Sequence, residues 1–141
     1  MTSFKIQFDA KVTDTFNQAN AIFALGVDEL FNQVITDTPV DTGFARASWW
    51  KSVNNVGTHP SPPVEVEKGQ SVAQSPQLGS QLNKITLTDK AFLSTSCVYM
   101  KRLEFYGHSN QRPRGWIRVI LGESDKYFKQ ARIIVKRKGI K

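Results

Sequence analysis

Residues 38–50 of this chain are Thr38-Pro39-Val40-Asp41-Thr42-Gly43-Phe44-Ala45-Arg46-Ala47-Ser48-Trp49-Trp50, and they join a helical pattern to a strand pattern. A residue that precedes proline avoids the helical conformation, so Thr38 is expected to end the helix before it. Pro39 has no amide donor, which suits a chain leaving a helix. The Asp41 carboxylate is expected to bond the amides of Thr42 and Gly43, and Gly43 supplies a positive φ. The stretch therefore predicts a tight corner between two elements of different kinds.

The segment before the corner has the periodicity of a helix. Apolar residues recur at three- and four-residue steps over residues 10–37, which marks one helix face, and Asp9 is the expected N-cap. These apolar residues are Val12, Phe16, Ala19, Phe23, Val27, Leu30, Phe31, Val34 and Ile35. Ahead of them, Phe4 to Phe8 alternate between apolar and polar, so residues 1–9 are expected to form a short strand or an extended arm.

The segments after the corner predict strands and a loop. Residues 44–53 alternate between apolar and polar positions, which is typical of a half-buried strand. The apolar positions are Ala45, Ala47, Trp49 and Val53, and the polar ones are Arg46, Ser48 and Ser52. Residues 54–80 contain several glycines and prolines and predict a long flexible loop, with a short helical turn near residues 78–82. Residues 84–99 predict two further strand segments with a turn at Asp89-Lys90.

The last third of the chain predicts helices. Residues 99–109 have the pattern of a short helical turn ended by Gly107, and residues 110–115 form a loop. From Trp116 to Lys136 the apolar spacing is helical, with Gly122 as a weak point. The chain is therefore expected to be a single α+β domain over residues 1–141. Its long N-terminal helix packs on a small, mostly antiparallel sheet, followed by the central loop and a C-terminal helix.

Composition limits the class of protein. With 40% hydrophobic and 22% charged residues in 141, the chain has the composition of one globular domain. Cys97 is the single cysteine, which excludes an internal disulfide and favours a reducing compartment. We expect it to be a small buried side chain rather than a nucleophile. No apolar run is long enough to span a bilayer, and no signal-peptide pattern is present, so no membrane association is expected.

The net charge of +7 is concentrated at the C-terminal end. Residues 126–141 contain seven of the 19 basic residues and none of the 12 acidic ones, so the rest of the chain is formally neutral. Cations near a helix C-terminus interact favourably with the helix dipole. The alternative is attraction to phosphate or to an acidic protein face. The residues predicted to contact a partner or DNA are Arg112, Arg114, Lys129, Lys136, Arg137 and Lys138.

Two motifs of the chain support a comparison with a known family. The first is Thr38-Pro39-Val40-Asp41-Thr42-Gly43 followed by Arg46, Ser48 and Trp49, and the second contains Tyr99, Leu103-Glu104-Phe105, Gly107-His108-Ser109-Asn110-Gln111, Pro113 and Gly115-Trp116. Together they resemble the signature of tailed-bacteriophage neck and tail-completion proteins, which include head–tail joining proteins and relatives of the lambda minor tail protein Z. The resemblance spans about residues 4–136, and the extra aromatic Tyr106 before Gly107 departs from it.

The resemblance implies a non-enzymatic ring subunit at the head-proximal end of a phage tail. Such a subunit completes the tail and helps to join it to the head, as part of a virion assembled in the host bacterial cytoplasm. It implies a homo-oligomer, by analogy with tail symmetry a hexameric ring, in contact with other neck and tail proteins and with DNA passing through the channel. No cofactor is implied. The residues that carry over as structural are Pro39, Asp41, Thr42, Gly43, Arg46, Trp49, Glu104 and Gly107.

Elementary chemistry suggests how the two motifs meet. The Glu104 carboxylate is expected to bond Arg46 or the amides of the Asp41 turn, an interaction of about 1–3 kcal/mol if it is buried. This arrangement would make Asp41 an architectural residue of the corner.

Two alternatives remain open at this stage. Asp41-Thr42-Gly43 is also the active-site triplet of aspartic proteases, and a retroviral-type enzyme would dimerise so that two carboxylates share a proton. Val119-Ile120-Leu121-Gly122 matches a further element of those enzymes, but they need an apolar strand ahead of the aspartate, where this chain has a helical pattern and Pro39. The second alternative is nucleic-acid binding. Arg102, Arg112, Arg114 and Arg118 lie close in sequence to Tyr106 and Trp116, so cations and stacking surfaces are combined.

The sequence offers no metal site. His59 and His108 have no cysteine or carboxylate at ligand spacing, so neither is expected to bind a metal.

Overall fold

The computed structural model describes residues 3–40, 43–57, 62–67, 69–70, 85–107 and 111–139. Its elements in chain order are α1 (Ser3–Asp37), α2 (Phe44–Ala47), β1 (Trp49–Val53), β2 (Ala91–Thr95), α3 (Met100–Phe105), α4 (Trp116–Gly122) and α5 (Ser124–Lys138). The predicted α+β fold with a long N-terminal helix, a small antiparallel sheet and a C-terminal helix is confirmed. None of the helices in these residue ranges combines the length and hydropathy needed to cross a bilayer.

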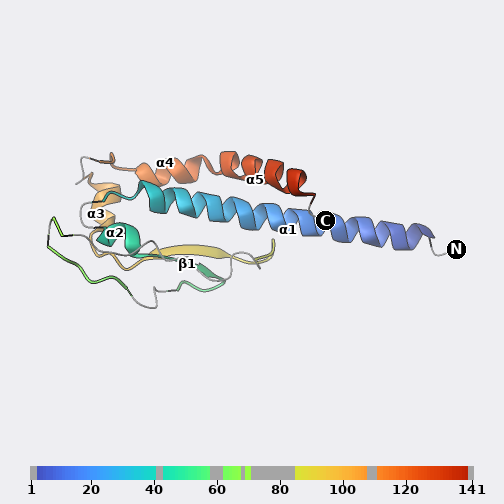
Figure 1. Cartoon of the computed structure of the whole chain (residues 1–141), viewed down its shortest axis with the longest axis horizontal. Coiled ribbons are helices and arrows are strands. Elements are labelled where there is room, and N and C mark those ends of the chain that lie inside the picture. Colours follow the sequence, from blue (N-terminus) through green and yellow to red (C-terminus); the bar gives the residue numbers. More distant parts are fainter. Residues whose placement is uncertain are drawn as a thin grey trace.

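Helix α1 is the central layer of the molecule (Figure 1). The two-stranded sheet lies on one side of it, and α4 and α5 lie on the other. Helix α5 runs antiparallel to α1 and ends about halfway along it, so the N-terminal half of α1 projects beyond the rest of the fold. The buried cluster accordingly lies around the C-terminal half of α1. It includes Val27, Leu30, Phe31, Val34 and Ile35 of α1 with Phe44, Trp49, Ile85, Cys97, Met100, Leu103, Trp116, Ile120 and Tyr127.

The expectation of a strand or extended arm at residues 1–9, with a helix N-cap at Asp9, is wrong for the part that the structure describes. Helix α1 already begins at Ser3 and continues through Asp9. A short alternating segment needs a neighbouring strand to satisfy its backbone, and the described sheet consists of β1 and β2 alone. Extending an existing helix satisfies one backbone group per added residue, so the segment joins the helix instead.

The strand after the corner is shorter than predicted. Phe44–Ala47 forms the helical turn α2, and the strand β1 begins only at Trp49. Gly43 has φ 86° and precedes this turn, which confirms the predicted positive φ. The Ser48 hydroxyl donates to the Ala45 carbonyl at 2.6 Å and closes the turn locally. Such short side-chain to backbone bonds compete with strand pairing.

Residues 85–99 contain one strand, β2, instead of the two strand segments expected there. Strand β1 pairs antiparallel with β2, from Trp49↔Thr95 to Val53↔Ala91, whereas residues 85–90 form a turn. The Asp89 carboxylate accepts from the Thr86 amide at 2.8 Å and from the Asn54 side chain at 3.1 Å. These bonds hold residues 86–90 in a turn, so the predicted strand at 84–88 is wrong where it is described.

The predictions for the last third of the chain are confirmed in the described residues. The helical turn before Gly107 is present as α3, and Gly107 has φ 66°. The C-terminal helix is present and breaks directly after Gly122, as predicted. Cys97 is buried. The described parts of the 54–80 loop contain no helix or strand, while the predicted turn at residues 78–82 lies outside the described residues.

Candidate functional site

The corner after α1 is held by a fully buried threonine. Thr38 follows the last residue of α1 and is 1% exposed. Its hydroxyl donates to the Val34 carbonyl at 2.8 Å and accepts the indole N–H of Trp49 at 2.8 Å. One hydroxyl thus connects the end of α1 to the first residue of β1. This bond makes Trp49 a structural residue of the corner.

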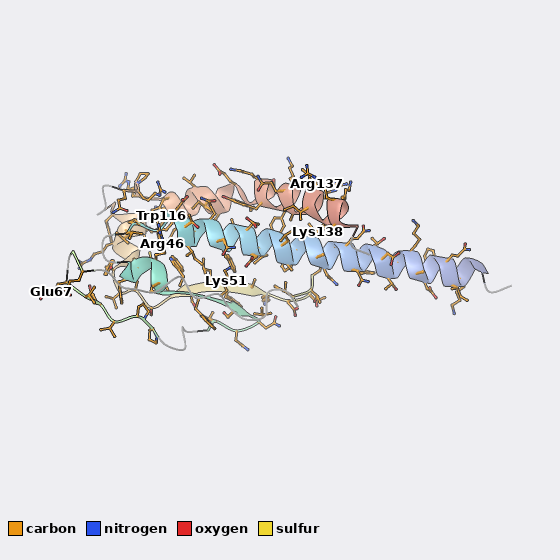
Figure 2. All side chains as sticks on the ribbon, viewed as in Figure 1. Arg46, Lys51, Glu67, Trp116, Arg137 and Lys138 are labelled. Carbon is orange, nitrogen blue, oxygen red and sulfur yellow. The ribbon has the colours of Figure 1, made fainter. Side chains whose placement is uncertain are left out.

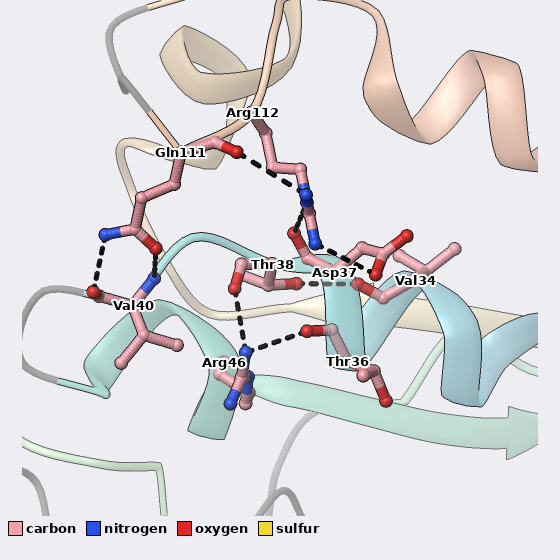
Figure 3. A network of polar contacts seen from close by, with 8 residues as sticks. All are labelled: Val34, Thr36, Asp37, Thr38, Val40, Arg46, Gln111 and Arg112. Carbon is pink, nitrogen blue, oxygen red and sulfur yellow. Dashed lines mark hydrogen bonds and ion pairs between the residues drawn. The ribbon is translucent and has the colours of Figure 1, made fainter.

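Arg46 binds the corner from the other side (Figure 3). Its Nη2 donates to the Thr36 carbonyl at 2.7 Å and to the Thr38 carbonyl at 3.4 Å. The last carbonyls of a helix have no partner within the helix, so a cation that reaches them satisfies acceptors and matches the helix dipole. Arg46 is therefore a C-terminal cap of α1 supplied by α2. The predicted contact between Arg46 and Glu104 is not formed.

Gln111 of the second motif and the residue that follows it, Arg112, reach the same corner. Gln111 accepts from the Val40 amide at 2.8 Å and donates to the Val40 carbonyl at 2.6 Å, in the manner of a strand partner. Arg112 donates from Nε to the Asp37 carbonyl at 2.9 Å and from Nη2 to the Asp37 carboxylate at 3.2 Å. Figure 3 shows both side chains over the end of α1. The two motifs, separated by a long loop in the sequence, therefore meet at one site.

Glu104 has a different role from the predicted one. It is 5% exposed, and its two carboxylate oxygens accept from the amides of Ile117 and Arg118 at 2.8 and 3.1 Å. The Arg118 side chain adds an ion pair at 3.0 Å and lies 4.8 Å from the ring centre of Phe105. The first amides of a helix lack internal acceptors, and a carboxylate there is favourable. Glu104 thus caps the N-terminus of α4. Glu104 and α4 are close in sequence, but the spacing of the residues did not reveal this contact.

The glycines of the two motifs allow the turns at which the elements meet. At Gly107, which has a positive φ, an added Cβ would lie 3.3 Å from the Cβ of Arg114. The backbone of Gly107 therefore passes close to Arg114, in the loop before α4. Pro39 is buried at the corner. Asp41 and Thr42 lie outside the described residues, and so do His59 and His108.

A buried polar network between the sheet and α1 was missed by the sequence analysis. Lys51 of β1 is 1% exposed, and its Nζ donates to Asp28 and Asn32 of α1 at 2.6 Å each (Figure 2). Asn32 also donates to Asp28 at 3.3 Å, which closes a triangle. Alternation from Trp49 to Val53 places Lys51 on the apolar face, so a buried lysine was detectable. Its partners were not, although Asp28 and Asn32 are four residues apart on a helix.

Helix α5 presents a basic strip to solvent. Lys129, Arg132 and Lys136 follow the spacing i, i+3, i+7 and are exposed, whereas Tyr127, Ala131 and Val135 on the other face are buried. None of the three makes an ion pair with an acidic residue in the described part of the chain. Arg137 and Lys138 are exposed at the C-terminal end of the helix (Figure 2). Of the predicted contact residues, Arg112 is instead engaged with Asp37.

A shallow cleft of about 350 Å³ lies between the end of α1, the second motif and α5. Its lining includes Asp37, Arg112, Trp116, Glu123 and Tyr127. Burial raises the pKa of the Tyr127 phenol, and the negative charges of Glu123 and Asp37 raise it further. The phenol therefore stays protonated at neutral pH and is no base or nucleophile there. Cations and carboxylates line the cleft together, which favours no one class of ligand.

The described residues include one free thiol, that of Cys97, and no cluster of metal ligands. No cluster of three or more His, Cys, Asp or Glu within these ranges is arranged to hold a metal ion. Burial raises the pKa of the Cys97 thiol, and hydrogen bonds from Tyr99 offset part of this effect. Residues 3–37 form α1, and Val119–Gly122 belong to α4, so neither segment is the strand that an aspartic protease requires.

Comparison with known proteins does not place the chain in a family. No protein-family model matches it, and searches of curated proteins and of solved structures gave no significant match. The resemblance to phage neck and tail-completion proteins therefore rests on the two motifs.

Proposed function

We propose that this protein is a structural subunit of a ring at the head-proximal end of a phage tail, where it completes the tail and helps to join it to the head. One observation carries the proposal: the two motifs of the family signature form one packed corner. Gln111 of the second motif bonds directly to the backbone of Val40 in the first, and its neighbour Arg112 bonds to Asp37, the residue before the first motif. A signature whose halves bond to each other is expected for a fold that many sequences share.

The burial of the motif residues fits a structural role. Thr38, Trp49 and Glu104 are all buried and are satisfied by bonds within the chain. They maintain a shape, and other surfaces are left for neighbouring subunits. Heterologous contacts between copies form a closed ring when the rotation from one copy to the next is a whole fraction of a full turn. A hexamer would match a tail of sixfold symmetry.

The proposal is tested by removing the gene from a tailed phage that encodes this chain and imaging the particles by electron microscopy. We expect filled heads and separate, incomplete tails, and normal joining when the wild-type gene is supplied in trans. Native mass spectrometry of tails from the complemented phage would give the number of copies in the ring. Joined, infectious particles in the absence of the gene would refute the proposal.

The basic strip supports a second candidate function, which is non-specific binding to the phosphate backbone of DNA. The strip carries three cations on two turns of one helix face, with no described acidic partner. Phosphate binding releases counterions, so such an affinity falls steeply with salt. Within a ring, the strip would face DNA in the channel.

A matched pair of variants tests this second function. Replacing Lys129, Arg132 and Lys136 by glutamine should weaken binding to a short duplex at low salt by at least tenfold and reduce the salt dependence. Replacing Lys5 and Lys11, which are exposed on the N-terminal half of α1, should have little effect. Equal loss in both variants, or no binding by the wild type at low salt, would exclude the strip as a DNA site.

A further inference from the structure

The N-terminal half of α1 carries a solvent-exposed apolar stripe. We call residues 5–18 the arm. Within it Phe8, Val12 and Phe16 are 57%, 37% and 59% exposed, at four-residue steps. Side chains four residues apart lie on the same side of a helix, so the three form one continuous stripe. The arm projects beyond the rest of the described fold (Figure 1).

The stripe continues a helix face that α5 covers further along α1. By helical spacing, Phe23 lies on the same side as Phe8 and Val12. Phe23 stacks on Phe128 of α5 with ring centroids 6.3 Å apart, and Gly26 allows Phe128 to approach α1 closely. Helix α5 ends about halfway along α1, and from there the same face is open (Figure 1). The open face is therefore the continuation of a seam that already accepts an antiparallel helix.

We infer that this stripe is covered by the arm of a second copy of the chain, in an antiparallel, two-fold symmetric pair. A second arm in this position would run in the same direction as α5 and begin where α5 ends. The exposed stripe on one copy is as long as the arm of the other copy that packs on it. One antiparallel contact therefore covers the stripes of both copies. A contact of this kind is isologous, because the same patch is used on both copies.

Charge favours a second copy over the other possible occupants. The charged residues of the arm are Lys5, Lys11, Asp9 and Asp14, and their formal charges sum to zero. Two arms can therefore approach each other without net electrostatic repulsion. An anionic partner such as nucleic acid would be drawn to the basic strip of α5 instead. Helices that bind anionic membranes carry an excess of basic residues on their polar face, whereas the two lysines of the arm are balanced by two aspartates.

The inference goes beyond the proposed ring function and does not depend on it. Rings close through heterologous contacts, whereas the arm pair uses one patch twice. Two short helices bury less area than a standard stable interface of about 1,600 Å², so the pair should be weak and depend on concentration.

Sedimentation velocity of the full-length protein over a hundredfold concentration range tests the pair. We expect the wild type to shift from monomer to dimer, and the double variant Phe8→Ser/Phe16→Ser to remain monomeric over the whole range. The matched control is Ile6→Ser, since Ile6 is 60% exposed but lies about 160° around the helix from Phe8. The control should dimerise as the wild type does. A wild type that stays monomeric, or a dimer that survives the double substitution, overturns the inference.

Cross-linking tests the direction of pairing in a Cys97→Ala background. Centred between residues 11 and 12, the middle of the arm, an antiparallel pair places position 8 of one copy close to position 16 of the other. A mixture of Phe8→Cys and Phe16→Cys chains should therefore form disulfides faster than either chain alone. Faster cross-linking of each single variant with itself would indicate parallel arms and would overturn the antiparallel arrangement.

Discussion

Glu104 receives three donors from the first turn of α4, namely the amides of Ile117 and Arg118 and the Arg118 side chain. Glu104 is 5% exposed, so these bonds take the place of water as donors to its carboxylate oxygens. Thr38 plays a comparable part at the end of α1, where one hydroxyl both donates and accepts. In each case a single side chain joins two elements.

We predict that Glu104→Ala lowers the free energy of unfolding by about 2–3 kcal/mol, because it removes a charged acceptor from two helix amides. Urea denaturation followed by tryptophan fluorescence would measure the change. Glu67→Ala is the control, since Glu67 is exposed, and it should stay within about 0.5 kcal/mol of the wild type. A loss below about 1 kcal/mol for Glu104→Ala would show that water replaces the carboxylate as acceptor.

For single residues, the sequence predicted backbone conformation better than it predicted side-chain contacts. The positive φ values of Gly43 and Gly107 were predictable because few other residues adopt them. The partner of Glu104 was not, since the sequence does not show which donors are nearest in space. Arg46 and the amides of α4 are both chemically suitable donors. Only the packing of α3 against the start of α4 selects the amides.

Phe128 of helix α5 packs directly over Gly26 of helix α1. An added Cβ at Gly26 would lie 2.3 Å from Cδ1 of the Phe128 ring. The ring is itself stacked on Phe23, so it has little freedom to move aside. The seam between the two helices therefore depends on the absence of one methyl group.

Gly26→Ala should destabilise the fold by about 2 kcal/mol, because overpacking in a closed interface forces side chains away from their rotamers. Gly122→Ala provides the comparison, because it is also helical and no atom lies within 4 Å of the added Cβ. That variant should be neutral or more stable by up to about 1 kcal/mol. Urea midpoints of both variants measured side by side check the prediction. Equal midpoints would mean that Phe128 moves aside at little cost.

The elements themselves were predictable in proportion to their length and regularity. The C-terminal helix and its break after Gly122 follow from apolar spacing and a residue with low helix propensity. The conformation of residues 3–9 did not, because five alternating positions fit a strand while the preference of a neighbouring long helix to extend decided the outcome. Residues 85–90 were misassigned for a related reason, since the bonds of Asp89 outweigh a weak alternation.

The stability of the whole molecule is expected to depend on alkaline pH through Cys97. Burial raises the pKa of its thiol in the folded protein. In the unfolded chain the thiol loses its proton near pH 8.5, so above that pH the unfolded state binds fewer protons than the folded state. The free energy of unfolding therefore falls as pH rises from about 8.5 towards the higher pKa of the folded state.

Cys97→Ala should remove this part of the pH dependence. Urea midpoints measured between pH 7 and pH 10 should fall less steeply for the variant than for the wild type. The range stops at pH 10 because Tyr127, whose pKa is also raised, contributes above it. Parallel curves for the two proteins would show that the thiol does not control the dependence.

Helix α1 is 35 residues long, yet only its C-terminal half lies in the folded body. The amide hydrogens of this one helix should therefore exchange with solvent by two different routes. Those between Val27 and Ile35 should exchange only when the whole domain unfolds, whereas those between Lys5 and Phe16 should exchange by fraying from the end. Hydrogen–deuterium exchange with mass spectrometry would resolve the two segments. Protection of the outer segment should rise with protein concentration, so one continuous helix would report both the stability of a monomer and its encounter with another.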